Sequence, residues 1–257
     1  MITRFFLLTF AMSWLVQLPG VLATVGVIPG PAEKYMNLVG LGLLGPMIAA
    51  LILSRLEPGG TGAGALLRSI FGMRVRPLWI VLALTLPALG FLLSRGLYAL
   101  SGHDGGPWLY PPQSPQRWVA LVIAPIGEEI GWRGFALPRM QRRMSRVSAA
   151  LLLGVLWGLW HLMMNIVAGL SLAMNLASIF MLIPGSLIFS WLYNRSGGSL
   201  LIAILLHMGV HLSNPNQMLP GNSLPFYINI VGMTLLGLLV LPDRAAWRSE
   251  PELQPAM

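Results

Sequence analysis

The chain has 257 residues, of which 56% are hydrophobic and only 9% are charged. Soluble domains usually carry about 25% charged residues, so this composition excludes an ordinary soluble protein and indicates an integral membrane protein. The net charge of +8 does not indicate nucleic-acid binding, because the basic residues lie in loops between apolar runs, where they set membrane topology. The sequence has no cysteine, which excludes disulfides, thiolate nucleophiles and cysteine-ligated metal sites.

Apolar runs follow one another along the chain, each close to the roughly 20 residues that cross a bilayer as a helix. Backbone polar groups cannot stay unpaired in lipid, so helices are expected rather than strands. We therefore predict an all-α, multi-span integral membrane protein with eight transmembrane helices. The predicted spans are residues 5–28, 37–53, 78–100, 118–138, 148–169, 171–193, 199–214 and 224–241.

The basic residues between these spans fall mainly on one side of the membrane. Lys and Arg are enriched in cytoplasmic loops, so both termini are predicted to be cytoplasmic and the protein to lie in the cytoplasmic membrane. The residues on the predicted cytoplasmic side are Arg4, Arg55, Arg68, Arg74, Arg76, Arg139, Arg142, Arg143, Arg146, Arg195, Arg244 and Arg248, and those on the other side are Lys34, Arg95 and Arg117.

Two adjacent acids, Glu128 and Glu129, lie inside the fourth predicted span, whereas the other six acids lie in short polar stretches. An ionisable group at the centre of a bilayer costs about 2.5–3.5 kcal/mol on insertion scales. The adjacent acids therefore predict a functional site. The alternative is a structural ion pair that fastens two helices.

Arg133 follows Glu129 by four residues, so the two side chains share one face of a helix. Arg133 is expected to neutralise and orient Glu129 through a charge-assisted hydrogen bond. Glu128 is rotated by about 100° on a helix of 3.6 residues per turn, which leaves it free for another task such as general base catalysis.

Three histidines, His161, His207 and His211, also lie within predicted spans. Counting residues at about 1.5 Å each from the span ends places His161, His207 and Glu128 at similar depths near the middle of the bilayer. They share one cavity if the fourth, fifth and seventh helices adjoin. Glu and His together can activate water and stabilise an oxyanion, bind a divalent metal or pass protons in a transporter.

These residues resemble the motifs of the CPBP intramembrane proteases, which include the type II CAAX prenyl endopeptidases. The family motif Glu-Glu-x-x-x-Arg is matched by Glu128, Glu129 and Arg133. The second motif, usually Phe-x-x-x-His, is represented by Trp157 and His161. In the third, His-x-x-x-Asn in many members, His207 matches and His211 stands where Asn is common.

The resemblance implies a glutamate-dependent endopeptidase with a membrane-embedded active-site cavity. By similarity, Glu128 and His161 would activate water. His207, with His211, would donate to the oxyanion, and Glu129 and Arg133 would hold the first motif in place. Asn165 and Asn214 are the alternatives to His211 as a donor. The resemblance implies no cofactor, and it leaves a divalent metal such as Zn²⁺ open.

The resemblance also implies three segments: N-terminal helices at 1–117, a catalytic core at 118–214, and a last helix with a short tail at 215–257. The expected partners are a peptide or protein substrate, with or without a lipid, and membrane lipid, but not nucleic acid. One alternative is a non-catalytic scaffold or a bacteriocin self-immunity protein. Another is a proton-coupled transporter, although the sequence shows no repeat relating its two halves, which that class often has.

Overall fold

The computed structural model describes residues 1–57, 59, 62–72, 74–103, 114–213 and 224–248, and the regular secondary structure in these ranges is helical. In chain order the elements are α1 (Ile2–Thr24), η1 (Ala32–Tyr35), α2 (Met36–Gly42), α3 (Gly45–Leu56), α4 (Gly62–Arg68), α5 (Pro77–Leu100), α6 (Pro115–Glu129), η2 (Ile130–Ala136), α7 (Leu137–Gln141), α8 (Arg146–Trp160), α9 (Leu162–Val167), α10 (Leu172–Arg195), α11 (Leu200–Leu212), α12 (Leu224–Leu239) and α13 (Arg244–Trp247). The predicted all-α class is confirmed.

Five helical segments in the described ranges are long and apolar enough to cross a membrane. They are Ile2–Thr24, Ala32–Leu56, Pro77–Leu100, Arg146–Val167 and Leu172–Arg195, and the shorter apolar helices are Leu200–Leu212 and Leu224–Leu239. The protein is therefore a multi-span membrane protein. The predicted span at 118–138 is helical but is not among these segments. It differs from them because it carries Glu128, Glu129 and Arg133 within its apolar sequence.

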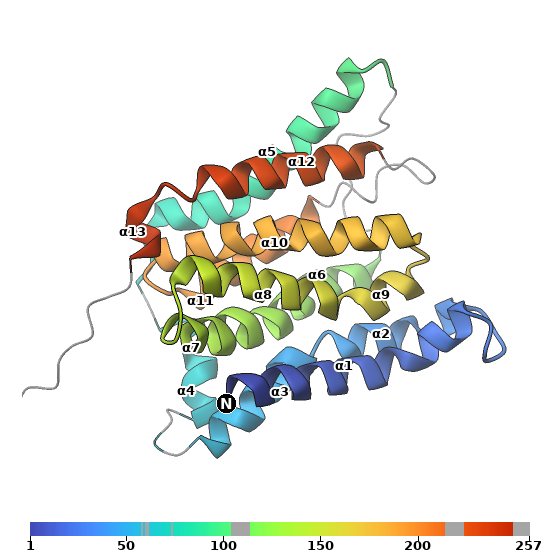
Figure 1. Cartoon of the computed structure of the whole chain (residues 1–257), viewed down its shortest axis with the longest axis horizontal. Helices are drawn as coiled ribbons and strands as arrows, with labels where there is room; N and C mark the ends of the chain where they lie inside the picture. The colour runs from blue at the N-terminus through green and yellow to red at the C-terminus, as the bar shows by residue number, and fades with distance from the viewer. Residues whose placement is uncertain (58, 60–61, 73, 104–113, 214–223, 249–257) are drawn as a thin grey trace, which may run out of the picture.

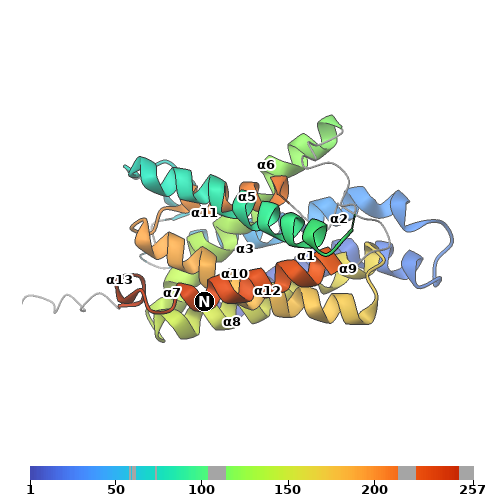
Figure 2. The same ribbon diagram turned by 90° about the horizontal axis from the view of Figure 1, so that it is seen from above.

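Most helices run side by side along the long axis of the molecule (Figures 1 and 2). Helix α8 packs mainly against α10, while α11 packs against α5 and α6. The segment formed by α6 and η2 also contacts α3. The start of α1 and the short helix α13 lie at the same end of the bundle (Figure 1). This arrangement brings the parts of α6, η2 and α11 that carry Glu128, Glu129, Arg133 and His207, and the residue Trp157 of α8, into the interior.

Glycines allow two of these helices to approach their neighbours closely. A Cβ atom on Gly131 would lie 2.4 Å from the Cβ of Pro46 in α3, and one on Gly158 would lie 2.7 Å from the carbonyl oxygen of Ile179 in α10. Neither position can accept a larger residue without movement of the neighbouring helix. The two glycines therefore fix η2 against α3 and α8 against α10.

The backbone departs from α-helical geometry directly after the two acids. Element η2 is π-helical over its seven residues and contains Arg133, a feature that the sequence did not predict. Short π-helical segments occur mostly within α-helices and frequently at functional sites. All of η2 except Gly134 is buried, so the irregular segment lies inside the protein.

Candidate active site

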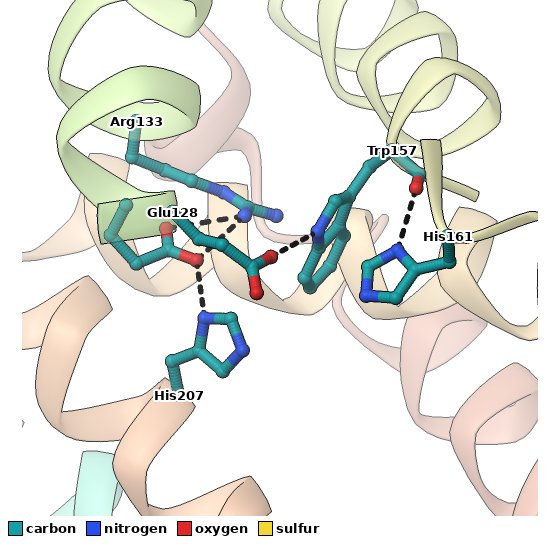
Figure 3. A network of polar contacts seen from close by, with 6 residues as sticks. Glu128, Arg133, Trp157, His161 and His207 are labelled. Atoms are coloured by element: carbon teal, nitrogen blue, oxygen red, sulfur yellow. Dashed lines mark hydrogen bonds and ion pairs between the residues drawn. The ribbon is translucent and has the colours of Figure 1, made fainter. Parts of the chain in front are cut away.

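Glu129 and Arg133 form the predicted ion pair. The Arg133 Nη1 atom lies 3.0 Å from Glu129 Oε1 and 3.1 Å from Oε2 (Figure 3). Both side chains are fully buried. A charge this deep is tolerated when it is paired and hydrogen-bonded. The sequence identified the pair because the four-residue spacing is a property of one helical segment.

His207 joins the same carboxylate from a different helix. Its Nδ1 atom, on α11, lies 2.8 Å from Glu129 Oε1. His207 is itself buried, with 4% of its surface exposed. Glu129 therefore links η2 to α11 through Arg133 on one side and His207 on the other. The sequence placed His207 at a similar depth but did not predict this contact.

Glu128 also has a partner, contrary to the expectation that it is left free. Its Oε2 atom accepts a 2.8 Å hydrogen bond from the indole Nε1–H of Trp157 on α8. Glu128 is 2% exposed. The sequence marked Trp157 only as the aromatic residue of the second motif. It did not show that the indole N–H reaches the acid, because that contact depends on how α8 packs beside α6.

His161 lies at the junction of α8 and α9, where the sequence predicted one continuous span at 148–169. Its backbone N–H donates to the carbonyl of Gly158 at 3.1 Å, three residues back. In a continuous α-helix this N–H would donate to the carbonyl of Trp157. That carbonyl instead contacts the His161 ring, with Nδ1 at 2.8 Å. Because a carbonyl only accepts, Nδ1 carries the hydrogen, and Nε2 is the acceptor in the neutral ring.

His211 lies one helical turn beyond His207, and the centroids of the two rings are 4.9 Å apart. Its side chain is half-buried. The structure therefore brings the two residues of the third motif together, with His211 nearer to the surface of the protein than His207.

Asn165 and Asn214 were the alternatives to His211 as a donor, and the structure describes only the first of them. The Nδ2 atom of Asn165 donates to Asn175 Oδ1 at 3.1 Å and to Ser178 Oγ at 3.4 Å. Both partners lie on α10, so Asn165 makes an interhelical contact. Asn214 lies outside the described residues.

Two aromatic rings pack against the guanidinium group of Arg133. Its Cζ atom lies 4.5 Å from the ring centroid of Trp157 and 4.5 Å from that of Phe189. Its Nε and Nη2 atoms have no hydrogen-bond partner in the part of the chain that the structure describes. The rings thus replace water around part of the cation through cation–π contact. Phe189 had no sequence signal that marked it as part of the site.

The sequence left open whether the site binds a divalent metal, which would require several donor side chains close together. Among the described residues, no group of three or more His, Cys, Asp or Glu side chains is arranged to hold a metal ion.

Comparison with known proteins shows what this chain is similar to. Residues 111–213 match the family model described as "Type II CAAX prenyl endopeptidase Rce1-like". This segment of the chain is similar to that family. It is also 26% identical over 225 residues to "CAAX prenyl protease 2" of Methanococcus maripaludis, a match that covers 81% of this chain and 82% of that protein. The resemblance read from the three motifs is confirmed, and the Rce1-like segment contains Glu128, Trp157 and His207.

Proposed function

We propose that this protein is an intramembrane endopeptidase in which Glu128 and His161 activate a water molecule for attack on a peptide bond. The observation that carries the proposal is the pair of contacts at Trp157, whose indole binds the Glu128 carboxylate and whose carbonyl binds the His161 ring. One residue thus holds an acid from α6 and an imidazole from the α8–α9 junction. A carboxylate and an imidazole are the groups that most often take a proton from attacking water.

The proposed roles of the two groups follow from their free atoms. Within the described structure, the hydrogen bond recorded for Glu128 engages Oε2, so Oε1 is the oxygen that would accept from water. The acceptor nitrogen of His161 is Nε2, because Nδ1 is held by the Trp157 carbonyl. Glu128 would take the proton of the attacking water and later deliver it to the leaving amine.

His207 and His211 are the proposed donors to the tetrahedral oxyanion. The His207 Nδ1 atom already contacts the Glu129 carboxylate. If Nδ1 donates there, Nε2 can donate to an oxyanion only when the ring carries both hydrogens. Glu129 would balance the resulting positive charge. This gives Glu129 a role beyond holding Arg133, and the pair would keep the α11 donors beside the catalytic acid.

The similarity to a protein named as a CAAX prenyl protease supports a substrate of the same class. We propose a peptide or protein that reaches the membrane with a prenylated C-terminal segment, and we divide the chain into a catalytic core at 118–214 flanked by segments 1–117 and 215–257. We further propose eight crossings, with both termini in the cytoplasm. An alkaline phosphatase fusion at the C-terminus is then inactive in cells, and high activity of that fusion contradicts the topology.

The function is tested with purified protein in nanodiscs and a panel of C-terminal peptides, each prepared with and without a farnesyl group. Wild type is expected to cleave at least one prenylated peptide. Glu128→Gln is expected to lower turnover by at least 10²–10⁴-fold, the usual contribution of an acid–base group. Glu57→Gln is the matched control, because it makes the same substitution at an acid with a different partner. Glu57 lies at the end of α3 and contacts Arg139.

Three results of this assay are informative. Turnover of Glu128→Gln within about tenfold of wild type removes Glu128 from the mechanism, since acid–base groups contribute more than that. Cleavage that stops with chelator and returns with Zn²⁺ shows a metal-dependent reaction. A wild-type protein that cleaves no peptide, but protects cells from a peptide toxin equally well with Glu128→Gln, supports the non-catalytic alternative.

A further inference from the structure

Trp157 makes polar contacts, and not only packing contacts, with residues to which the proposed function assigns a role. Its indole Nε1–H donates to Glu128 Oε2 at 2.8 Å, and its carbonyl oxygen lies 2.8 Å from His161 Nδ1. The guanidinium of Arg133 lies over its ring. Figure 3 shows these three neighbours converging on the one residue.

The indole itself is held in one orientation by its surroundings. Trp157 is 3% exposed. The rings of Phe189 and His207 pack edge-on against it, with centroid distances of 5.4 Å and 5.7 Å. Phe189 and the indole also both pack against the guanidinium of Arg133. A donor fixed in this way needs no reorganisation when charge changes on its acceptor.

The hydrogen bond to Glu128 limits rotation of a side chain whose orientation affects the rate of the proposed reaction. The Glu128 side chain has several rotatable bonds, and its carboxylate lies in a buried site. A bond to Oε2 restricts rotation of the carboxylate and so limits the directions in which Oε1 can point. The orientation of a catalytic group relative to the reacting atoms can account for large factors in rate.

We propose that Trp157 is a positioning residue, and that its indole N–H holds Glu128 in the orientation that activates water. This inference rests on the proposed peptidase function. It adds that efficient cleavage requires the indole N–H of Trp157. A phenylalanine, the usual residue of the second motif, has no N–H and cannot make this bond. The aromatic variant in this chain is thus a functional substitution, and the carbonyl of the same residue fixes the hydrogen on His161.

Trp157→Phe tests the indole N–H while keeping an aromatic ring against the guanidinium of Arg133. Trp160→Phe is the matched control, because Trp160 is also buried, at 1% exposed, and its Nε1 has no hydrogen-bond partner among the described residues. Both variants remove one buried indole, but only the first removes a bond to Glu128. Both are assayed in nanodiscs on the peptide that wild type cleaves best.

The expected result is a fall in kcat of about 10- to 100-fold for Trp157→Phe, with KM within about twofold of wild type, which corresponds to losing one hydrogen bond to a charged group. Trp160→Phe should keep kcat within about threefold, because it loses no hydrogen bond. Equal kcat for wild type and Trp157→Phe overturns the proposal. An equal loss in both variants also overturns it, because the effect is then one of packing.

A spectroscopic measurement tests the bond without any peptide. The ultraviolet resonance Raman difference between wild type and Trp157→Phe isolates the indole N–H band of Trp157, which reports hydrogen bonding. This band should move towards its unbonded position in Glu128→Ala. A band that does not change with Glu128→Ala overturns the bond. If wild type cleaves no peptide, the proposed function fails, while the Raman comparison still decides whether Trp157 holds Glu128.

Discussion

Two arginine–carboxylate pairs in this protein have the same chemistry and different surroundings. Arg133 binds Glu129 and packs against the rings of Trp157 and Phe189, with both members of the pair fully buried. Arg139 binds Glu57 and lies over the ring of Phe135, but its side chain is 17% exposed and that of Glu57 is 25% exposed.

The second pair joins the end of α3 to α7 and has no contact with the histidines of the candidate site. The first pair extends through Glu129 to His207, and its guanidinium packs on the ring that binds Glu128. Pairing of an acid with an arginine is therefore a poor sign of function in this chain. Burial, together with contacts to further titratable groups, separates the candidate site from an ion pair that fastens two helices.

The largest expected effect on stability is that of replacing Arg133, and it is compared with the effect of replacing Arg139. Arg133→Ala should lower the free energy of unfolding by about 3–5 kcal/mol, because Glu129 is left as an unpaired buried charge. Arg139→Ala should cost about 1–2 kcal/mol, since a partly exposed ion pair and a cation–π contact are each worth about 1 kcal/mol or less. Unfolding of both variants in the same detergent, followed by circular dichroism, measures the difference.

Similar stability losses for Arg133→Ala and Arg139→Ala would show that burial does not distinguish the two pairs. Peptide cleavage is measured on the same samples at a temperature where both remain folded. Arg139→Ala is expected to cleave like wild type, whereas Arg133→Ala is expected to be inactive, because Glu129, which also binds His207, loses its cationic partner.

His211 lies at the edge of the candidate site. It is half-buried, and its ring contacts that of His207. If it donates to the oxyanion, His211→Ala should lower kcat by about 10²–10³-fold, the usual cost of removing one such donor. His211→Asn keeps an N–H donor at a similar reach and should retain most activity. Peptide cleavage by the two variants, with and without chelator, measures both effects.

Two other patterns would contradict the oxyanion role of His211. Full activity of His211→Ala limits this residue to packing against His207. Loss of activity in both variants, with recovery of wild type only after Zn²⁺ is added to chelator-treated protein, indicates that His211 is a metal ligand.

The smallest expected effect concerns the exposed pair. The hydrogen bond from Arg139 lowers the pKa of Glu57 below its ordinary value. The ionised form is therefore favoured in the folded protein, so this stabilisation is present above the unfolded pKa and is lost as pH falls through the folded pKa. Its size should be at most about 1 kcal/mol, because the pair is partly exposed to solvent.

Glu57→Gln isolates that contribution. Wild type should unfold at a slightly higher temperature than Glu57→Gln at pH 7, and the difference should disappear as the pH is lowered below about 4, beneath the ordinary glutamate pKa. A difference that grows on acidification means that the sign of the linkage is wrong. Peptide cleavage should be the same for both proteins at pH 7, in contrast to any change at Glu128.

Much of the candidate site was predictable because it depends on local spacing. Glu129 and Arg133 are four residues apart, and they pair in the structure. His207 and His211 have the same spacing, and their rings are adjacent. A helix places such residues on one face whatever surrounds it. The apolar runs likewise predicted helices, although the turn at His161 and the π-helical segment after Glu129 did not follow from hydrophobicity.

The sequence by itself determined that this is a helical membrane protein and that the acids and histidines of the candidate site lie within its apolar segments, because lipid requires apolar helices and makes each buried charge costly. Only the tertiary structure decided how those residues are joined. Trp157 and Glu128 are 29 positions apart, and His207 and Glu129 are 78 positions apart. Contacts over such separations depend on which helices pack together and how closely, and glycines such as Gly131 and Gly158 set that approach.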